Sequence, residues 1–325
     1  MKTDEDFYAR LDEIYASREE GAVLGFLTET AEETAKIDGG VNAEHMLCMS
    51  ELGSYYRGVS RYGESLRAFR KAEEIIAILF GKDSANYASN LTNMATSYRM
   101  MGDTDKALEL FLHSIRIYDA LQARDDKLYA GALNNIALLY QSTGEDEKAA
   151  DCLTKTIGIL ENRSDCKEET ATAYVNLSSL YAKSGASGRA DEAAALLDKA
   201  IDMFRSLPHE SAHFAAALNS KAAMLAAAGN TNEAMAHLRD AADKTKALFG
   251  ENADYGVCCR NMARLSARMR DYDAAVRFMR AAADVFGKVF GADRSIVIDA
   301  EREVEELARA AASARTDAGN ARCEG

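Results

Sequence analysis

A unit of about 42 residues recurs six times along this chain and constrains its fold more than any other feature. The segments SELGSYY, TNMATSY, NNIALLY, VNLSSLY, NSKAAML and RNMARLS align on one small residue each. Those residues are Gly53, Ala95, Ala137, Ser178, Ala222 and Ala263, and subtraction gives spacings of 42, 42, 41, 44 and 41. Repeats of this length are typical of units that bury their apolar face only by stacking on copies of themselves.

Each unit has the pattern of two helices joined by a turn. Four of the small residues are followed three positions later by a tyrosine, namely Tyr56, Tyr98, Tyr140 and Tyr181. After a turn rich in Gly, Asp and Asn, a large apolar residue precedes a small one by three positions: Phe69/Ala72, Phe111/Ser114, Leu153/Thr156, Leu197/Ala200, Leu238/Ala241 and Met279/Ala282. Small residues at fixed sites let two helices approach closely. With one proline, no tryptophan and many strong helix formers, the chain is predicted to be all-α.

These residues resemble tetratricopeptide repeats. The long period and the segments LFGKD, LFGEN and VFGAD, at 79–83, 248–252 and 289–293, are similar to the kinesin light chain subtype. The resemblance covers about residues 41–290 and implies a right-handed α-solenoid whose first helices line a concave binding face. It does not identify a partner, because such repeats serve many unrelated ones.

The rest of the chain is predicted to close the array at both ends. Residues 1–40 read as a degenerate helical pair that caps the six repeats of residues 41–290. Residues 291–314 read as a C-terminal capping helix, because the last apolar face needs a cover. We expect residues 315–325, with their polar and glycine-rich sequence, to form a disordered tail.

The composition argues against several classes of function. The net charge of −13 disfavours general attraction to nucleic acid or anionic lipid. The six cysteines lack metal-binding spacing and are expected to be free thiols in a reducing compartment. The acidic N-terminus does not resemble a signal peptide, and no apolar run approaches the ~20 residues of a membrane span. We therefore expect a cytoplasmic protein without a cofactor.

The segment HESAH, residues 209–213, has the His-Glu-x-x-His pattern of zinc peptidases. Glu233 follows His213 at a spacing similar to that of the third ligand in thermolysin-like enzymes. The repeat register instead places His209 in a loop and His213 just before a helix, whereas the motif belongs within one. Asn230 and Glu233 also match a helix capping box. We expect no enzyme, and a zinc metallopeptidase remains a remote alternative.

The face that the resemblance assigns to ligands lacks negative charge. None of its implied inward positions is Asp or Glu, and six are basic: Arg57, Arg99, Lys183, Arg260, Arg264 and Arg268. Arginine forks suit carboxylates. Asn134 and Asn219 are similar to the kinesin light chain asparagines that hold a peptide backbone. Alternatively, the arginines are solvated or pair with Asp271, Asp273 and a neighbouring unit. For Asn93, Asn135, Asn176 and Asn261, hydrogen bonds within the repeat packing are favoured.

The leading hypothesis is a non-enzymatic scaffold that binds an extended acidic segment of a protein in its groove. Arg57, Arg99, Arg260, Arg264 and Arg268 would meet carboxylates. Head-to-tail self-association is an alternative, because residues 1–40 carry a net charge of −7 and residues 255–280 a net +4. A peptide-sensing regulator is a further alternative that the sequence leaves open.

Overall fold

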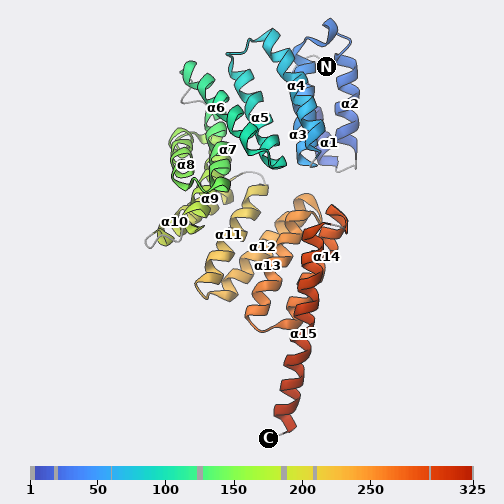
Figure 1. Ribbon diagram of the computed structural model, residues 1–325, viewed down its shortest axis with the longest axis vertical. Helices are drawn as coiled ribbons and strands as arrows, with labels where there is room; N and C mark the ends of the chain where they lie inside the picture. Colours follow the sequence, from blue (N-terminus) through green and yellow to red (C-terminus); the bar gives the residue numbers. More distant parts are fainter. Residues whose placement is uncertain are drawn as a thin grey trace. The chain divides into compact units, whose positions relative to one another are not determined.

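The computed structural model describes residues 4–17, 21–59, 61–122, 127–183, 189–207, 211–292 and 294–323. Within those ranges the chain forms fifteen α-helices and two short 3-10 helices, without any strand (Figure 1). The helices fall into two compact units, residues 1–163 (unit 1) and residues 164–325 (unit 2). The all-α prediction is therefore confirmed, and the repeats divide between two units. No helix in the described part of the chain has both the length and the apolar character needed to cross a membrane.

Unit 1 contains the N-terminal helical pair and the first three repeats. Its helices are α1 (Asp4–Ser17), α2 (Ala22–Thr34), α3 (Ala43–Gly58), α4 (Tyr62–Leu79), α5 (Ala85–Met101), α6 (Thr104–Ala120), α7 (Lys127–Thr143) and α8 (Asp146–Leu160), with a 3-10 helix at Asp38–Gly40. The first and second helix of each repeat pack together, and consecutive repeats stack on one another.

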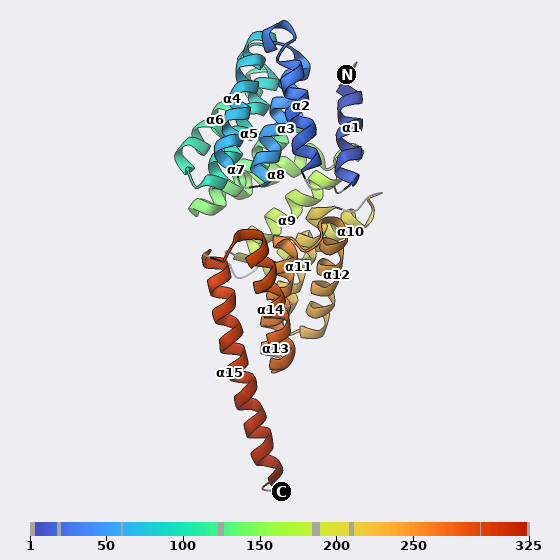
Figure 2. The same ribbon diagram turned by 90° about the vertical axis from the view of Figure 1, so that its right-hand side faces the viewer.

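Unit 2 contains the last three repeats and one further helix. Its helices are α9 (Lys167–Lys183), α10 (Ala190–Arg205), α11 (Ala212–Ala227), α12 (Thr231–Phe249), α13 (Ala253–Arg268), α14 (Tyr272–Phe290) and α15 (Ser295–Cys323), with a 3-10 helix at Ser164–Cys166. Both views show α15 beside α14 at the C-terminal end of this unit (Figures 1 and 2).

The small residues that define the repeat are buried at helix contacts. Gly53, Ala95, Ala137, Ser178, Ala222 and Ala263 are all buried, as are the six large apolar residues of the second helices. The helices approach closely at Gly53, where an added Cβ would lie 2.7 Å from the ring of Phe69. Phe69 is itself fully buried. The repeat register read from the sequence is thus confirmed by the packing.

The recurring tyrosine supports the turn between the two helices of its repeat. An Arg or Lys side chain after the turn places its charged group 4.4–5.3 Å from the centroid of the tyrosine ring. The pairs are Tyr56/Arg61, Tyr98/Lys106, Tyr140/Lys148 and Tyr181/Arg189. A cation over an aromatic ring is worth about 0.5–1 kcal/mol at an exposed site. The fifth and sixth repeats have Leu225 and Ser266 in place of tyrosine, so these two turns lack the contact.

Several helix ends follow the local sequence. Ser84, Asp103 and Asn252 cap their helices through side-chain oxygens that accept backbone N–H groups. Asn230 precedes α12 as predicted, but its side chain makes no capping hydrogen bond, so the capping box is wrong. Gly250 and Gly291 follow long helices with φ of 70° and 83°, a region that favours glycine.

The closing helix is longer than the sequence analysis predicted. α15 continues to Cys323, beyond residue 314, where we expected a disordered tail to begin. The segment from Arg315 to Cys323 has no proline and contains alanine and arginine, which sustain a helix once one has started.

Candidate functional site

The inward positions implied by the repeat lie on accessible faces of the first helices. In unit 1 they fall on α3, α5 and α7, and all fifteen are exposed or half-buried. In unit 2 they fall on α9, α11 and α13, where Val175 alone is buried. Side chains on these faces are therefore available to a ligand in each unit.

Arg57, in the last turn of α3, is half-buried and reaches into the next repeat. Its Nη1 donates to the backbone oxygen of Asn93 at 3.1 Å and lies 3.3 Å from Asn93 Oδ1. Its guanidinium lies 5.4 Å from the centroid of the Phe69 ring. Burial lowers the pKa of Arg57, the charge of Glu51 partly opposes this shift, and the charge of Arg99 adds to it.

Arg99 occupies the equivalent place on α5, one repeat further along. Burial lowers its pKa as well. Its Nε is buried and has no hydrogen-bond partner among the described residues. No ion pair joins Arg57 or Arg99 to an acidic side chain in the described part of unit 1. Two neighbouring guanidinium groups thus share a partly desolvated surface without a carboxylate bound to either.

The arginine stripe on α13 divides into three different environments. Arg260 lies 5.5 Å from the centroid of the Phe286 ring, and its buried Nε has no hydrogen-bond partner among the described residues. Arg264 forms a two-bond ion pair with Glu303 of α15, which raises the pKa of Arg264. Arg268 donates to the backbone oxygen of Ala226 at 2.8 Å. The partner of Arg264 therefore comes from the closing helix.

Asp271 and Asp273, considered in the sequence as partners of the stripe, have other contacts. Asp271 accepts the backbone N–H of Ala274 at 3.0 Å and caps α14. Asp273 pairs with Arg315 of α15.

Amide side chains link neighbouring first helices. The Nδ2 of Asn261 donates to Asn219 Oδ1 at 3.2 Å, and Asn219 Nδ2 donates to Cys258 Sγ at 3.0 Å. Asn93 accepts from Arg57 as described above. The inter-repeat hydrogen bonds predicted for Asn93 and Asn261 are thereby confirmed, whereas Asn135 bonds Gly131 within its own helix. Asn134 is half-buried on α7.

A hollow of about 240 Å³ lies between α11 and α13 in unit 2. Its lining combines the amides of Asn219 and Asn261 with Arg264 and Arg268 of the stripe. The apolar residues of the lining are Ala222, Ala223, Ala226, Leu238 and Leu265. The hollow has room for one side chain of a ligand, with amide and guanidinium donors at its edge.

The zinc motif is not supported by the described residues. His209 and Glu210 lie outside them, His213 is exposed in the first turn of α11, and Glu233 is exposed in the first turn of α12. Across the described ranges, no group of three His, Cys, Asp or Glu side chains is placed to hold a metal ion.

The thiols next to the stripe are packing groups. Cys258 and Cys259 are buried, and burial raises the pKa of both. A raised pKa keeps a thiol protonated and poorly nucleophilic.

Comparisons with known proteins agree with the geometry. Residues 45–120 match the family model of the tetratricopeptide repeat, and residues 132–288 match that of soluble NSF attachment protein, SNAP. No curated protein is significantly similar to the chain in sequence.

Several solved structures share the fold at low sequence identity. BtubC (BKLC) from P. vanneervenii is 21% identical, with a TM-score of 0.56 over 74% of this chain and 92% of that one. Aspartyl phosphate phosphatase F from Bacillus subtilis is 16% identical, with a TM-score of 0.64 over 89% of this chain and 70% of that one. The APC/C hetero-tetramer Cut9-Hcn1 is 12% identical, with a TM-score of 0.63 over 91% of this chain and 48% of the matched one.

These likenesses concern the fold alone. Together with the matched family model, the 42-residue register and the buried small residues, they give a consistent assignment. Residues 45–120 therefore form tetratricopeptide repeats, and the remaining repeats share their register and their packing.

Proposed function

We propose that this protein is a non-enzymatic scaffold that binds an extended acidic segment of a partner protein. Repeats of this type commonly form protein-interaction surfaces. The observation that carries the finer proposal is the pair Arg57 and Arg99, whose guanidinium groups are partly desolvated and bound to no carboxylate in the described part of unit 1.

The electrostatics of this pair favour an anionic ligand. Burial disfavours the charged form of each guanidinium, and at Arg57 the attraction of the Glu51 charge is followed by a smaller repulsion from Arg99. A carboxylate placed between them would add an attractive charge and compensate part of the desolvation of both groups. Hydrogen bonds to charged groups contribute about 1.5–3 kcal/mol each. Arginine is suited to this contact because its planar fork can hold both oxygens of one carboxylate.

The remaining candidate residues have supporting roles in the proposal. Asn134 on α7 would contact the ligand backbone in unit 1, and Asn219 would do so beside the hollow in unit 2. Arg260 and Arg268 would meet further acidic side chains. Arg264 would contribute only after a ligand carboxylate has displaced Glu303.

The rest of the chemistry supports a binding role. The buried thiols of Cys48, Cys258 and Cys259 form no disulfide, as in proteins of a reducing compartment, and we propose a cytoplasmic location. We propose no cofactor. The net charge of −13 favours a protein partner over nucleic acid or a membrane surface.

A capture experiment with matched variants tests the proposal. The wild type, Arg57→Gln/Arg99→Gln and Arg67→Gln/Arg116→Gln would each be immobilised, exposed to lysate and analysed by mass spectrometry. The control removes two charges from exposed positions on α4 and α6. We expect a partner that both the wild type and the control capture, that the first variant loses, and that salt releases. Equal capture by the three proteins would overturn the role of Arg57 and Arg99.

The captured partner then identifies the ligand segment. Peptides spanning its acidic regions would be titrated against the wild type by fluorescence anisotropy, each beside a version with Asp and Glu replaced by Asn and Gln. Loss of binding on neutralisation supports carboxylate recognition. Equal binding of the neutral peptides would overturn it.

A further inference from the structure

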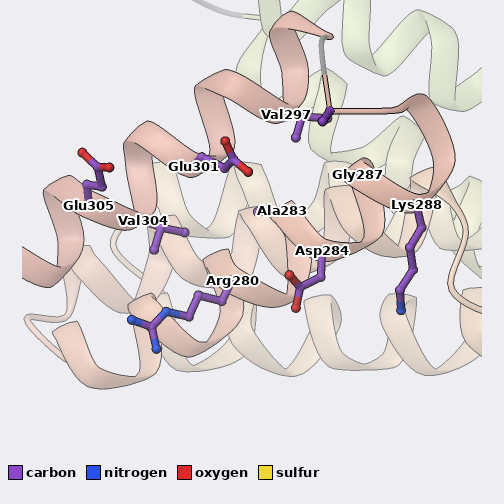
Figure 3. Close-up of a pocket in the computed structure, with 10 residues that line it drawn as sticks. Arg280, Ala283, Asp284, Gly287, Lys288, Val297, Glu301, Val304 and Glu305 are labelled. Carbon is purple, nitrogen blue, oxygen red and sulfur yellow. The ribbon is translucent and has the colours of Figure 1, made fainter.

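A groove of about 740 Å³ runs between α14 and α15 at the C-terminal end of unit 2. Figure 3 shows that both helices line it with apolar and charged side chains. Its apolar lining includes Ala283, Gly287, Val297 and Val304. Glu301 and Glu305 project from α15, while α14 contributes Arg280, Asp284 and Lys288. The groove lies on a different helix pair from the proposed peptide site.

The repeat register identifies this groove as a seat for a helix. Gly250 and Gly291, which precede α13 and α15, are 41 residues apart. In the sixth repeat, α14 packs on α13 so that its Phe286 meets Gly256 and Arg260. The residues 41 positions later are Val297 and Glu301, and both line the groove.

A helix seated there in the manner of the repeat would run antiparallel to α15. In each repeat of unit 2 the second helix returns along the first, as α14 does along α13. The described residues 294–323 supply no second helix that could cover α15 in this way. The exposed Glu301 and the half-buried Val304 therefore leave this side of α15 accessible to an antiparallel helix of the same kind.

The charges along α15 identify a suitable helix. Residues 299–306 contain five acidic side chains and one arginine, whereas residues 307–316 contain Arg309 and Arg315 and no acid. Glu301, Glu305 and Arg309 form no ion pair with another described residue. An antiparallel copy of α15 would place its basic half over the acidic half of the first copy. The same contact would form twice, as a two-fold axis requires.

The side chains of α15 also permit close packing. Its second half is rich in alanine, with Ala308, Ala310, Ala311, Ala312 and Ala314 in succession around Ser313. Small residues let two helices approach closely. The half-buried Val304 of the first copy then faces a helix whose surface is mostly methyl groups.

From this groove and its charge pattern we propose that two copies of the chain associate through α15. The α15 helix of each copy occupies the α14–α15 groove of the other, which gives an antiparallel four-helix contact with closed two-fold symmetry. This arrangement ends at a dimer, unlike the open head-to-tail association that the charges of the chain ends had suggested. It does not depend on the proposed peptide site.

A charge-exchange experiment tests the dimer. Glu301→Lys/Glu305→Lys would bring positive charges together at both halves of the contact, and Arg309→Glu/Arg315→Glu would bring negative charges together. Arg315 pairs with Asp273, but this pair is on the surface and contributes little to folding. We expect a dimer for the wild type in sedimentation velocity at low salt, and dimer dissociation constants raised about tenfold for each variant, or ~1.4 kcal/mol.

Mixing the two variants gives the decisive result, because each half of a mixed dimer then pairs Lys with Glu or Glu with Arg. We expect mixed dimers to re-form with near wild-type affinity. Asp105→Lys/Glu109→Lys, an exposed pair of reversals at the same spacing on α6, is the control and should dimerise like the wild type. A monomer at all concentrations, dimers insensitive to the reversals, or no recovery on mixing would each overturn the proposal. Circular dichroism of every variant would verify that it is folded.

Discussion

Glu303 on α15 holds Arg264 on α13 with both carboxylate oxygens, at 2.6 Å from Nη2 and 3.2 Å from Nε. The two residues are 39 positions apart and belong to consecutive first helices. The contact shows that an arginine on this face binds a carboxylate in the two-bond geometry that the proposed ligand would use. The closing helix thereby supplies one anionic partner itself.

Glu303→Gln should release this guanidinium at little cost to the fold. The side chains of Arg264 and Glu303 are 55% and 25% exposed, so the pair is worth under about 1 kcal/mol. We expect the free energy of unfolding, measured in urea, to fall by less than about 1 kcal/mol in the variant. We also expect the variant to capture acidic partners more strongly at low salt. A destabilisation of more than about 2 kcal/mol would show that the pair is needed for folding.

Gly53→Ala should destabilise unit 1. The new Cβ would lie 2.7 Å from the fully buried Phe69 ring, and overpacking of this kind costs about 1–3 kcal/mol. This exceeds the helix propensity that alanine gains over glycine, about 1 kcal/mol. Gly158→Ala on α8 is the matched control, because nothing lies within 4 Å of its added Cβ. The melting temperature should fall for Gly53→Ala and rise for Gly158→Ala. A rise for both variants would contradict the close approach of Gly53 to Phe69.

Unit 1 should lose stability as the pH falls below about 6.5, the usual pKa of histidine. His45 is buried on α3 beside Thr34, whose hydroxyl lies 3.0 Å from Nδ1. Burial and, to a lesser extent, the charge of Lys71 lower the pKa of His45. A hydrogen bond to the backbone of Ala31 has a smaller, opposite effect. The unfolded chain therefore binds more protons in this range, and acid favours it. The free energy of unfolding in urea should fall less between pH 7.5 and 5.5 in His45→Gln than in the wild type. In the exposed control His113→Gln it should fall as much as in the wild type.

The Cys48 thiol should resist alkylation while unit 1 is folded. Burial, with a smaller effect of the Glu51 charge, raises its pKa to about 12, and its Sγ donates to the backbone oxygen of Leu27 at 2.9 Å. Iodoacetamide reacts with the thiolate, which is scarce at pH 8 under these conditions. Mass spectrometry should find Cys48 unlabelled in the native protein and labelled in urea. Rapid native labelling would mean that α3 separates from α2.

Much of the fold could be predicted because the repeat fixes which side chains meet. Gly53 and Phe69 recur in equivalent form in the other repeats, so their contact follows from alignment. The tyrosine pattern is also visible in the sequence, together with a possible partner for its ring. A cation lies eight residues after Tyr98, Tyr140 and Tyr181, and five after Tyr56. That spacing was the signal that could have revealed the contact at the turns.

The site was less predictable because its contacts join helices through long side chains. Arg57 reaches Asn93 across 36 residues, and this depends on the rotamer of the arginine. The repeat pattern does not predict the role of Glu303, because α15 departs from that pattern, with Val304 where the register puts a small residue. The polar composition of residues 315–323, with Gly319 and Asn320, does not predict a helix, whereas a helix that has already started can propagate through such a segment.

In the proposed complex, the half-buried Arg57 and Arg99 would couple ligand binding to the folding of unit 1. Keeping two desolvated charges side by side weakens the free protein, and a bound anion removes that penalty only in the folded state. A ligand present at 100 times its dissociation constant stabilises the folded form by about 2.7 kcal/mol. The melting temperature of the protein would then report binding of the proposed partner, and a library of acidic peptides could be ranked by thermal melts alone.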